Sequence, residues 1–213
     1  LSAGLGDGVE FNNFTISLYD PKVRIWDFDT QSQEEDFVFL KKNATNLSGC
    51  VQDGALNFSA DNSADGNRRA ILDECLEVKN ISVEINPQGA NWKEGGIILG
   101  DDGNNGNNNL LSIYASNCVE FKVCAGSGAD WIAIKAIKYK QGTMLFEKWY
   151  QGIDNTKPMR LSLKIDGTTV KATVTSLADI TKTQEAIIDI TKDKNGNATS
   201  YDKDTLVGRP GLS

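Results

Sequence analysis

The residues from 131 to 139 combine aromatic and basic side chains at a spacing suited to ligand binding. Alternation along a strand places Trp131, Lys135 and Tyr139 on one face and aliphatic side chains on the other. Sugars stack their C–H faces on exposed aromatic rings and are then held by a few polar groups. The row therefore predicts a glycan-binding face. The alternative is that the two rings only cover the surface of a sandwich.

A second aromatic candidate lies in the polar loop at residues 87–94. Trp92 is flanked there by Asn91, among glycine and other polar residues, so an exposed ring with an amide beside it is expected. The asparagine-rich stretch 104–109 could add hydrogen bonds. Trp26 and Trp149 are expected in the core, because large aromatic side chains dominate sandwich packing.

Two aspartates near the start of the chain are the candidates for catalysis. Asp27 and Asp29 alternate on one predicted strand at 23–29, so both could face a cleft. Glycosidases need two such carboxylates, roughly 5–10 Å apart. The alternative is a solvated strand face or a pair of cation ligands. The chain has no histidine, which excludes Ser-His-Asp chemistry and removes the commonest zinc ligand. We therefore do not expect an enzyme; if the chain were one, it would be a glycoside hydrolase.

Residues 193–204 resemble a calcium-binding loop. Asp193, Asn195, Asn197 and Asp204 occupy positions 1, 3, 5 and 12, as in loops that hold calcium with oxygen ligands. The loop lacks glycine at position 6, and Asn195-Gly196 is itself a preferred two-residue turn. A structural Ca²⁺ and a plain hairpin both remain open.

Four cysteines, Cys50, Cys75, Cys118 and Cys124, permit two disulfides with three connectivities. Cys50–Cys75 and Cys118–Cys124 are the local choice. Two disulfides would indicate a secreted or cell-surface protein. The alternative is four small, buried thiols.

Short alternating runs separated by glycine, asparagine and aspartate fill the chain, as is typical of a sandwich or barrel. The clearest hairpin spans residues 158–175 and turns at Asp166-Gly167. One short helix is expected around residues 68–76. No internal repeat or linker divides the 213 residues, so we expect one domain over 1–213, with 1–20 as an extended lead-in.

The overall charge excludes some partners. There are 22 basic and 29 acidic residues, a net charge of −7, and the basic residues are scattered, so nucleic acid is not expected. No apolar run approaches the roughly 20 residues that cross a bilayer. No signal peptide is visible, so we expect a mature segment or an excised module of a larger multidomain chain.

Four segments together resemble the concanavalin A-like lectin/glucanase superfamily in its laminin-G-like branch. They are Val51-Gln-Asp-Gly-Ala-Leu56, the strand–loop–strand at 81–99, the hairpin at 160–174 and Val207-Gly-Arg-Pro-Gly-Leu212. The resemblance implies an all-β fold, a two-sheet antiparallel jelly-roll sandwich. It does not imply one function, because the superfamily holds lectins, adhesion domains, glucanases and lyases. The strand motif of three alternating acids that its glucanases carry is missing here.

The expected function is a non-catalytic carbohydrate-recognition module of a secreted or cell-surface protein, attached to a polysaccharide-active enzyme. Its partner would be a glycan or polysaccharide. Two alternatives remain: a glycoside hydrolase with a dispersed carboxylate pair, and a protein-binding adhesion or scaffold domain.

Overall fold

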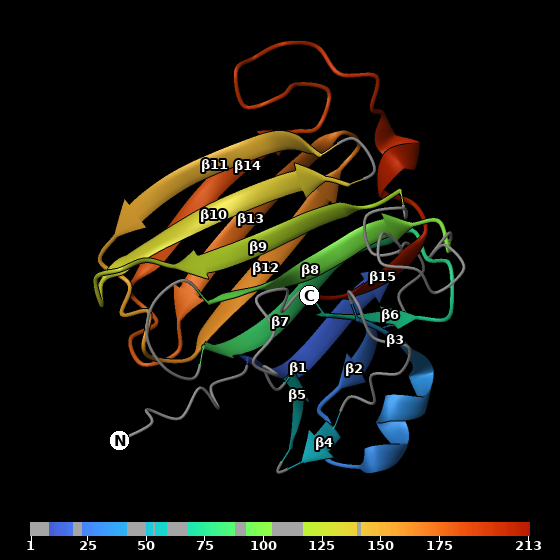
Figure 1. Cartoon of the computed structure of the whole chain (residues 1–213), viewed down its shortest axis with the longest axis vertical. Coiled ribbons are helices and arrows are strands. Elements are labelled where there is room, and N and C mark those ends of the chain that lie inside the picture. The colour runs from blue at the N-terminus through green and yellow to red at the C-terminus, as the bar shows by residue number, and fades with distance from the viewer. Residues whose placement is uncertain are drawn as a thin grey trace.

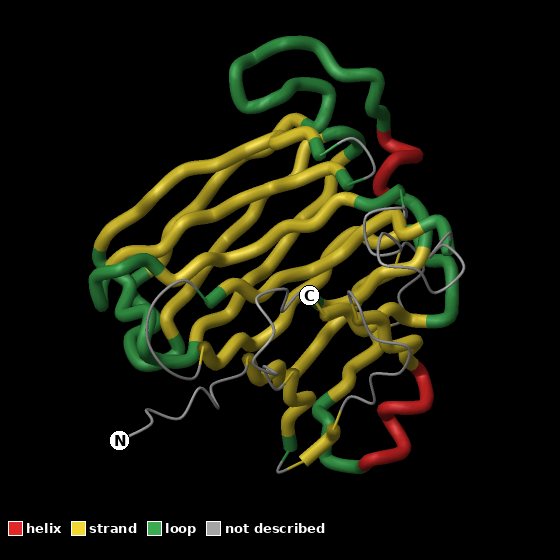
Figure 2. The backbone as a smooth tube through the Cα atoms, in the orientation of Figure 1, coloured by secondary structure: helices red, strands yellow, loops and turns green. Residues whose placement is uncertain are grey.

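A computed structural model describes most of the chain, and its described part is built from strands. It contains fifteen strands and two short 3₁₀ helices, η1 (Gln31–Asp36) and η2 (Lys203–Leu206) (Figure 2). The described residues are 9–18, 23–41, 50–52, 54–58, 68–87, 93–103, 117–139 and 142–213. Asn91, Trp92 and the 104–109 stretch lie outside them.

The strands form two antiparallel sheets. The eight-stranded sheet has the order β14 (Thr183–Asp189), β13 (Thr169–Ser176), β12 (Met159–Asp166), β7 (Val78–Pro87), β1 (Val9–Leu18), β5 (Ala55–Phe58) and β4 (Cys50–Gln52). Its eighth strand, β2 (Val23–Trp26), pairs with β1.

The seven-stranded sheet lies in front of the first in Figure 1. Its order is β11 (Thr143–Gln151), β10 (Trp131–Lys138), β9 (Val119–Ala125), β8 (Glu94–Asp101), β15 (Arg209–Leu212), β6 (Arg68–Leu72) and β3 (Phe37–Lys41). The expected all-β sandwich of two antiparallel sheets is confirmed.

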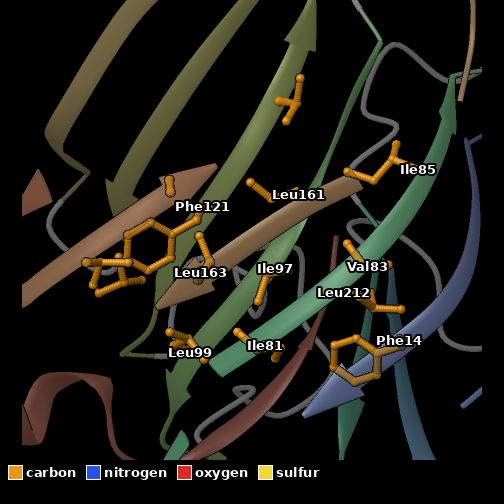
Figure 3. Close-up of a cluster of buried hydrophobic side chains, with 14 of the residues drawn as sticks. Phe14, Ile81, Val83, Ile85, Ile97, Leu99, Phe121, Leu161, Leu163 and Leu212 are labelled. Atoms are coloured by element: carbon orange, nitrogen blue, oxygen red, sulfur yellow. The ribbon is translucent and has the colours of Figure 1, made fainter. Parts of the chain in front are cut away.

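The core lies between the two sheets, where alternate residues of each strand meet (Figure 3). On β7 the buried positions Ile81, Val83 and Ile85 are those that alternation predicts, and Val78 joins them beyond a register shift between β1 and β7. Each fully buried aliphatic side chain of this kind stabilises the fold by about 1.5–3 kcal/mol relative to an exposed one. The residues that alternate with these buried positions point to the outer faces of the two sheets. The candidate sites lie on these outer faces.

Two local expectations are wrong. Residues 68–76 do not form a helix, because 68–72 are strand β6, which pairs with β3 and β15. The strand expected at 23–29 ends at Trp26, since Phe28 turns inward with a positive φ of 58° and is fully buried. Asp27 and Asp29 therefore follow the strand instead of alternating on it.

Candidate functional site

Strand β10 divides its side chains between the core and the outer face of the seven-stranded sheet. Ile132 and Ile134 lie in the core. Trp131 and Lys135, on the other face, occupy registers opposite Gln151 and Glu147 of β11. The expected division of the β10 side chains between the core and the outer face is confirmed for these residues.

Among the described aromatic side chains of this face, Trp131 is the exposed one, with 41% of its surface accessible. Its turn is held by Asn155, which is 4% exposed. The amide of Asn155 donates to the carbonyls of Gly128 and Trp131, both at 2.7 Å. Gly126 closes the same turn by donating to the Trp131 carbonyl at 2.8 Å. The ring therefore sits on a turn fixed by a buried side chain, and such preorganisation reduces the entropy lost on binding.

Gly126 also leaves the space that two indole rings require. A Cβ built on Gly126 would lie 2.8 Å from the Cβ of Trp131 and 3.0 Å from Cζ3 of Trp149. Trp149 was expected in the core, but it is half-buried and pairs with Ala133 on the outer face. The Lys135 ammonium lies 5.9 Å from the centre of its ring. Two indoles and one lysine thus share this part of the face.

Next to them lies a charged cluster of five side chains: Arg69, Glu94, Glu120, Lys122 and Lys135. Lys122 contacts Glu94 at 2.9 Å and Glu120 at 3.3 Å. Lys135 contacts Glu94 at 2.8 Å. Burial increases from Lys135 and Glu94, which reach the surface, to Glu120, which is 4% exposed. The cluster runs from the surface beside the indoles into the protein.

The deep end of the cluster is closed by Arg69 and Tyr139. The Arg69 guanidinium lies 3.6 Å from Oε2 of Glu120 and 4.4 Å from the centre of the Tyr139 ring. Lys122 donates to the Tyr139 hydroxyl at 3.5 Å. Tyr139 is 8% exposed, so this ring of the predicted aromatic–lysine–aromatic row is covered by protein. Trp131 is the ring of that row that a ligand could reach.

The cluster keeps its carboxylates ionised. Burial alone would raise the pKa of Glu120, but the charges of Lys122 and Arg69 outweigh it and lower the pKa to about 2. Burial also opposes ionisation of Glu94, whose pKa is nevertheless lowered by Lys122 and Lys135. The pKa of Tyr139 is raised, mainly by burial and then by the charge of Glu120. At neutral pH the cluster holds two carboxylates, two ammonium groups and one guanidinium, and the Tyr139 phenol that closes it is neutral.

Gly96 lets the strands carrying this cluster approach closely. It pairs with Lys122, and a Cβ on Gly96 would lie 2.3 Å from the Phe121 carbonyl and 2.7 Å from the Lys122 Cβ. A larger residue would push β8 away from β9. Glycine at position 96 therefore allows β8 and β9 to lie close together beside the charged side chains.

Sequence reasoning missed Arg69, Glu94, Glu120 and Lys122. A signal was present in Cys118-Val-Glu-Phe-Lys-Val-Cys124, where apolar residues at 119, 121 and 123 predict that Glu120 and Lys122 share the outer face. Their deep burial could not be read from one strand, because it depends on how the whole sheet is covered.

The weak catalytic candidates lie away from this cluster. The Asp27 carboxylate accepts hydrogen bonds from the Asp29 backbone at 3.2 Å and from Gln33 at 3.0 Å. These bonds lower the pKa of Asp27, with the backbone bond as the largest cause. Both aspartates are exposed. Asp27 thus caps the turn that leads into η1.

The calcium candidates also have local roles. Asp193 accepts from the backbone of Asn195 at 2.8 Å and from the side-chain amide of Asn197 at 2.9 Å, which closes the turn. Asp204 lies in η2, which is capped by Asp202. In the described part of the chain, no three His, Cys, Asp or Glu side chains gather as a metal site. Ca²⁺ binding by this loop stays a prediction.

The disulfide prediction is wrong for the described cysteines. Cys75, Cys118 and Cys124 carry thiols, of which Cys75 is exposed. Cys118 and Cys124 lie six residues apart along one extended segment, about 20 Å, whereas a disulfide needs Cα atoms about 4–7 Å apart. Cys50 belongs to the eight-stranded sheet, while Cys75 follows β6 of the other sheet, and the Cys50 side chain lies outside the described residues. The thiol of Cys118 accepts a hydrogen bond from Arg69 at 3.4 Å.

Comparisons with known proteins identify no relative. No family model, no curated protein and no solved structure matches this chain. No helix in the described ranges is long and apolar enough to cross a membrane.

Proposed function

We propose that this chain is a non-catalytic carbohydrate-recognition domain whose binding surface is the outer face of the seven-stranded sheet. The observation that carries the proposal is an exposed indole, Trp131, on a turn fixed by Asn155 and beside the charged cluster. The ring would stack on the C–H face of a sugar. Lys135, four residues or about 13 Å along β10 from Trp131, and Glu94 would then donate to and accept from hydroxyls further along the glycan.

The charged cluster supports a binding role, because burying these charges costs free energy that folding by itself does not require. Burying ion pairs requires removing their water, and apolar side chains of similar volume often stabilise a fold more. A buried network whose exposed end lies at an aromatic platform is the arrangement expected where polar groups must hold a fixed geometry for a ligand. Lys135 and Glu94 are the members that solvent reaches.

The two-sheet architecture and the four motif segments support membership in the concanavalin A-like superfamily as a jelly roll, which remains part of the proposal. The domain would act within a larger secreted or cell-surface protein that is active on polysaccharides. Trp92 and Asn91 would extend the surface, and Ca²⁺ at residues 193–204 would stabilise the fold.

A glycoside hydrolase is the second candidate, and one observation favours it. Glu94 and Glu120 contact the same Lys122 ammonium, so their carboxylates lie within roughly 6 Å, a separation that glycosidases use. The electrostatics oppose it, because a general acid needs a carboxyl with a raised pKa and the pKa of both groups is lowered. Detectable sugar release that is lost in Glu94→Gln would establish the hydrolase.

A glycan panel screened with the purified domain, in calcium and in chelator, tests the proposal. We expect binding to one glycan family, with at least a tenfold loss in Trp131→Ala. Ile187→Ala is a matched control, since Ile187 is 62% exposed on β14 of the other sheet. Its affinity should equal that of the wild type. A panel without binding, or equal binding by Trp131→Ala, would refute the proposal and favour an adhesion or scaffold domain.

A further inference from the structure

The outer face of the eight-stranded sheet carries a row of hydroxyl side chains across four neighbouring strands. Thr15 of β1 pairs with Ser82 of β7, Ser82 pairs with Ser162 of β12, and Ser162 pairs with Thr173 of β13. We call these four residues the hydroxyl row. Because neighbouring strands lie about 4.8 Å apart, the row spans about 14 Å at right angles to the strands. These four strands lie side by side behind the front sheet in Figure 1.

The hydroxyl row is the floor of a groove of about 220 Å³. Longer side chains line one side, where Asn80 pairs with Lys164 and Lys164 with Lys171. Beyond the groove on the other side, Arg160 contacts Glu84 at 2.6 Å and Asn13 donates to Glu84 at 2.9 Å. The small side chains of the hydroxyl row beside the longer Asn80 and lysine side chains make the groove.

The shape favours a linear ligand. Pockets that enclose a small molecule measure roughly 300–1,000 Å³, so this groove is a shallow track rather than an enclosing pocket. It is open to solvent and crosses the strands, so a chain can enter at one side and leave at the other. A polymer segment fits this shape better than a compact metabolite.

The chemistry of the floor favours a polyhydroxylated chain. Ser82, Ser162 and Thr173 are half-buried and make no side-chain hydrogen bond to other parts of the described chain. Each hydroxyl can therefore donate to and accept from a ligand. The floor offers none of the large apolar anchors that protein interfaces use. Two lysines are too few to hold a nucleic-acid backbone, and Lys171 already contacts Glu185 at 2.6 Å.

We propose that this groove is a second polysaccharide-binding site, which holds one linear glycan across strands β1, β7, β12 and β13 through the hydroxyl row. Lys164, which is exposed and makes no ion pair with other described residues, adds one cationic contact. A glycan bearing carboxylates or sulfates consequently binds more tightly than a neutral one. The site lies on the opposite side of the sandwich from Trp131, so the two sites act separately and one domain can bridge two chains.

Filling the groove tests the proposal. Ser162→Tyr places an aromatic ring in the middle of the floor, and strands tolerate such a substitution on a half-exposed face. Migration through gels that contain a soluble neutral β-glucan or a soluble polyuronate reports the affinity. In the Trp131→Ala background, where the groove is the remaining proposed site, we expect Ser162→Tyr to weaken the affinity for at least one polymer tenfold. The control is Thr183→Tyr, an exposed position on the edge strand β14 that does not line the groove.

The outcomes separate the two sites. Equal affinity in Trp131→Ala and in the double variant Trp131→Ala/Ser162→Tyr, with an unchanged melting temperature, would overturn the groove proposal. Loss in Ser162→Tyr with full affinity in Trp131→Ala would support the groove and refute the Trp131 site. A wild-type chain that neither polymer retards would overturn the groove proposal. Lys164→Ala should weaken polyuronate binding more than β-glucan binding, and an equal effect on both would contradict the cationic contact.

Discussion

Replacing Lys122 by methionine should cause a large loss of stability, because Lys122 is the cation that two carboxylates share. Its ammonium lies 2.9 Å from Glu94 and 3.3 Å from Glu120. Methionine is unbranched like lysine, ends one heavy atom earlier at Cε, and removes the charge. Glu94 retains Lys135 at 2.8 Å, whereas the cation that Glu120 retains among the described residues is Arg69, at 3.6 Å, beside its neutral hydrogen-bond partners Ser213 and Tyr139.

The expected magnitude follows from the burial of Glu120, of which 4% is accessible. Breaking a buried ion pair by removing one partner costs about 3–5 kcal/mol. Arg69 compensates part of this, so we expect a loss of about 3 kcal/mol. A loss of this size lowers the melting temperature of a 150–250-residue domain by about 6–12 °C.

Urea unfolding of four proteins measures the effect: wild type, Lys122→Met, Glu120→Gln and the double variant. We expect the double variant to be more stable than Lys122→Met, since the carboxylate that lost its partner is then neutral. Lys164→Met, at an exposed lysine without an ion pair among the described residues, is the control and should change stability by less than about 0.5 kcal/mol. A loss below about 1 kcal/mol in Lys122→Met, or strict additivity in the double variant, would refute the reasoning.

Three further predictions concern pH, the Trp131 turn and the thiols. Because the pKa of Glu120 is lowered from 4.5 to about 2, its contribution to stability is complete above pH 4.5 and is lost as the pH falls towards 2, and Glu120→Gln should flatten this part of the stability–pH curve in urea titrations. Asn155→Ala removes the two 2.7 Å bonds that hold the turn, so it should cost about 1–3 kcal/mol and increase hydrogen exchange at the Trp131 amide; unchanged exchange would contradict a fixed platform. The native protein should show fast thiol labelling at Cys75, and denaturation should expose at least two more thiols, whereas fewer than three thiols after denaturation without reductant would indicate a disulfide.

Much of the fold could be predicted because alternation in single strands determines which face is buried. The hairpin of β12 and β13 forms as expected, but its turn lies one residue later than Asp166-Gly167: Asp166 pairs with Thr169, so Gly167 and Thr168 are the turn residues, and Gly167 has a positive φ of 59°. The same rule assigned Trp131 and Lys135 to one face. Both features depend only on residues close together in the chain.

The charged cluster could not be predicted in this way, because it joins strands that are distant in sequence. Arg69 on β6 and Glu120 on β9 lie 51 positions apart, and no local pattern indicates that they meet. The helix expected at 68–76 failed for the same reason: pairing of β6 with two other strands outweighed a weak local preference. The disulfides failed because chain proximity was taken as spatial proximity, while the extended backbone separates Cys118 from Cys124.

The central claim, that Trp131 is a sugar-binding platform, is tested most directly by the indole N–H signals in an NMR titration with the best glycan from the panel. The chain has four tryptophans, and Trp26, which is buried in the core, serves as the internal control. We predict a saturable shift of the Trp131 signal, assigned through Trp131→Phe, and an unchanged Trp26 signal. A Trp131 signal that stays in place while the glycan binds would contradict the proposed site.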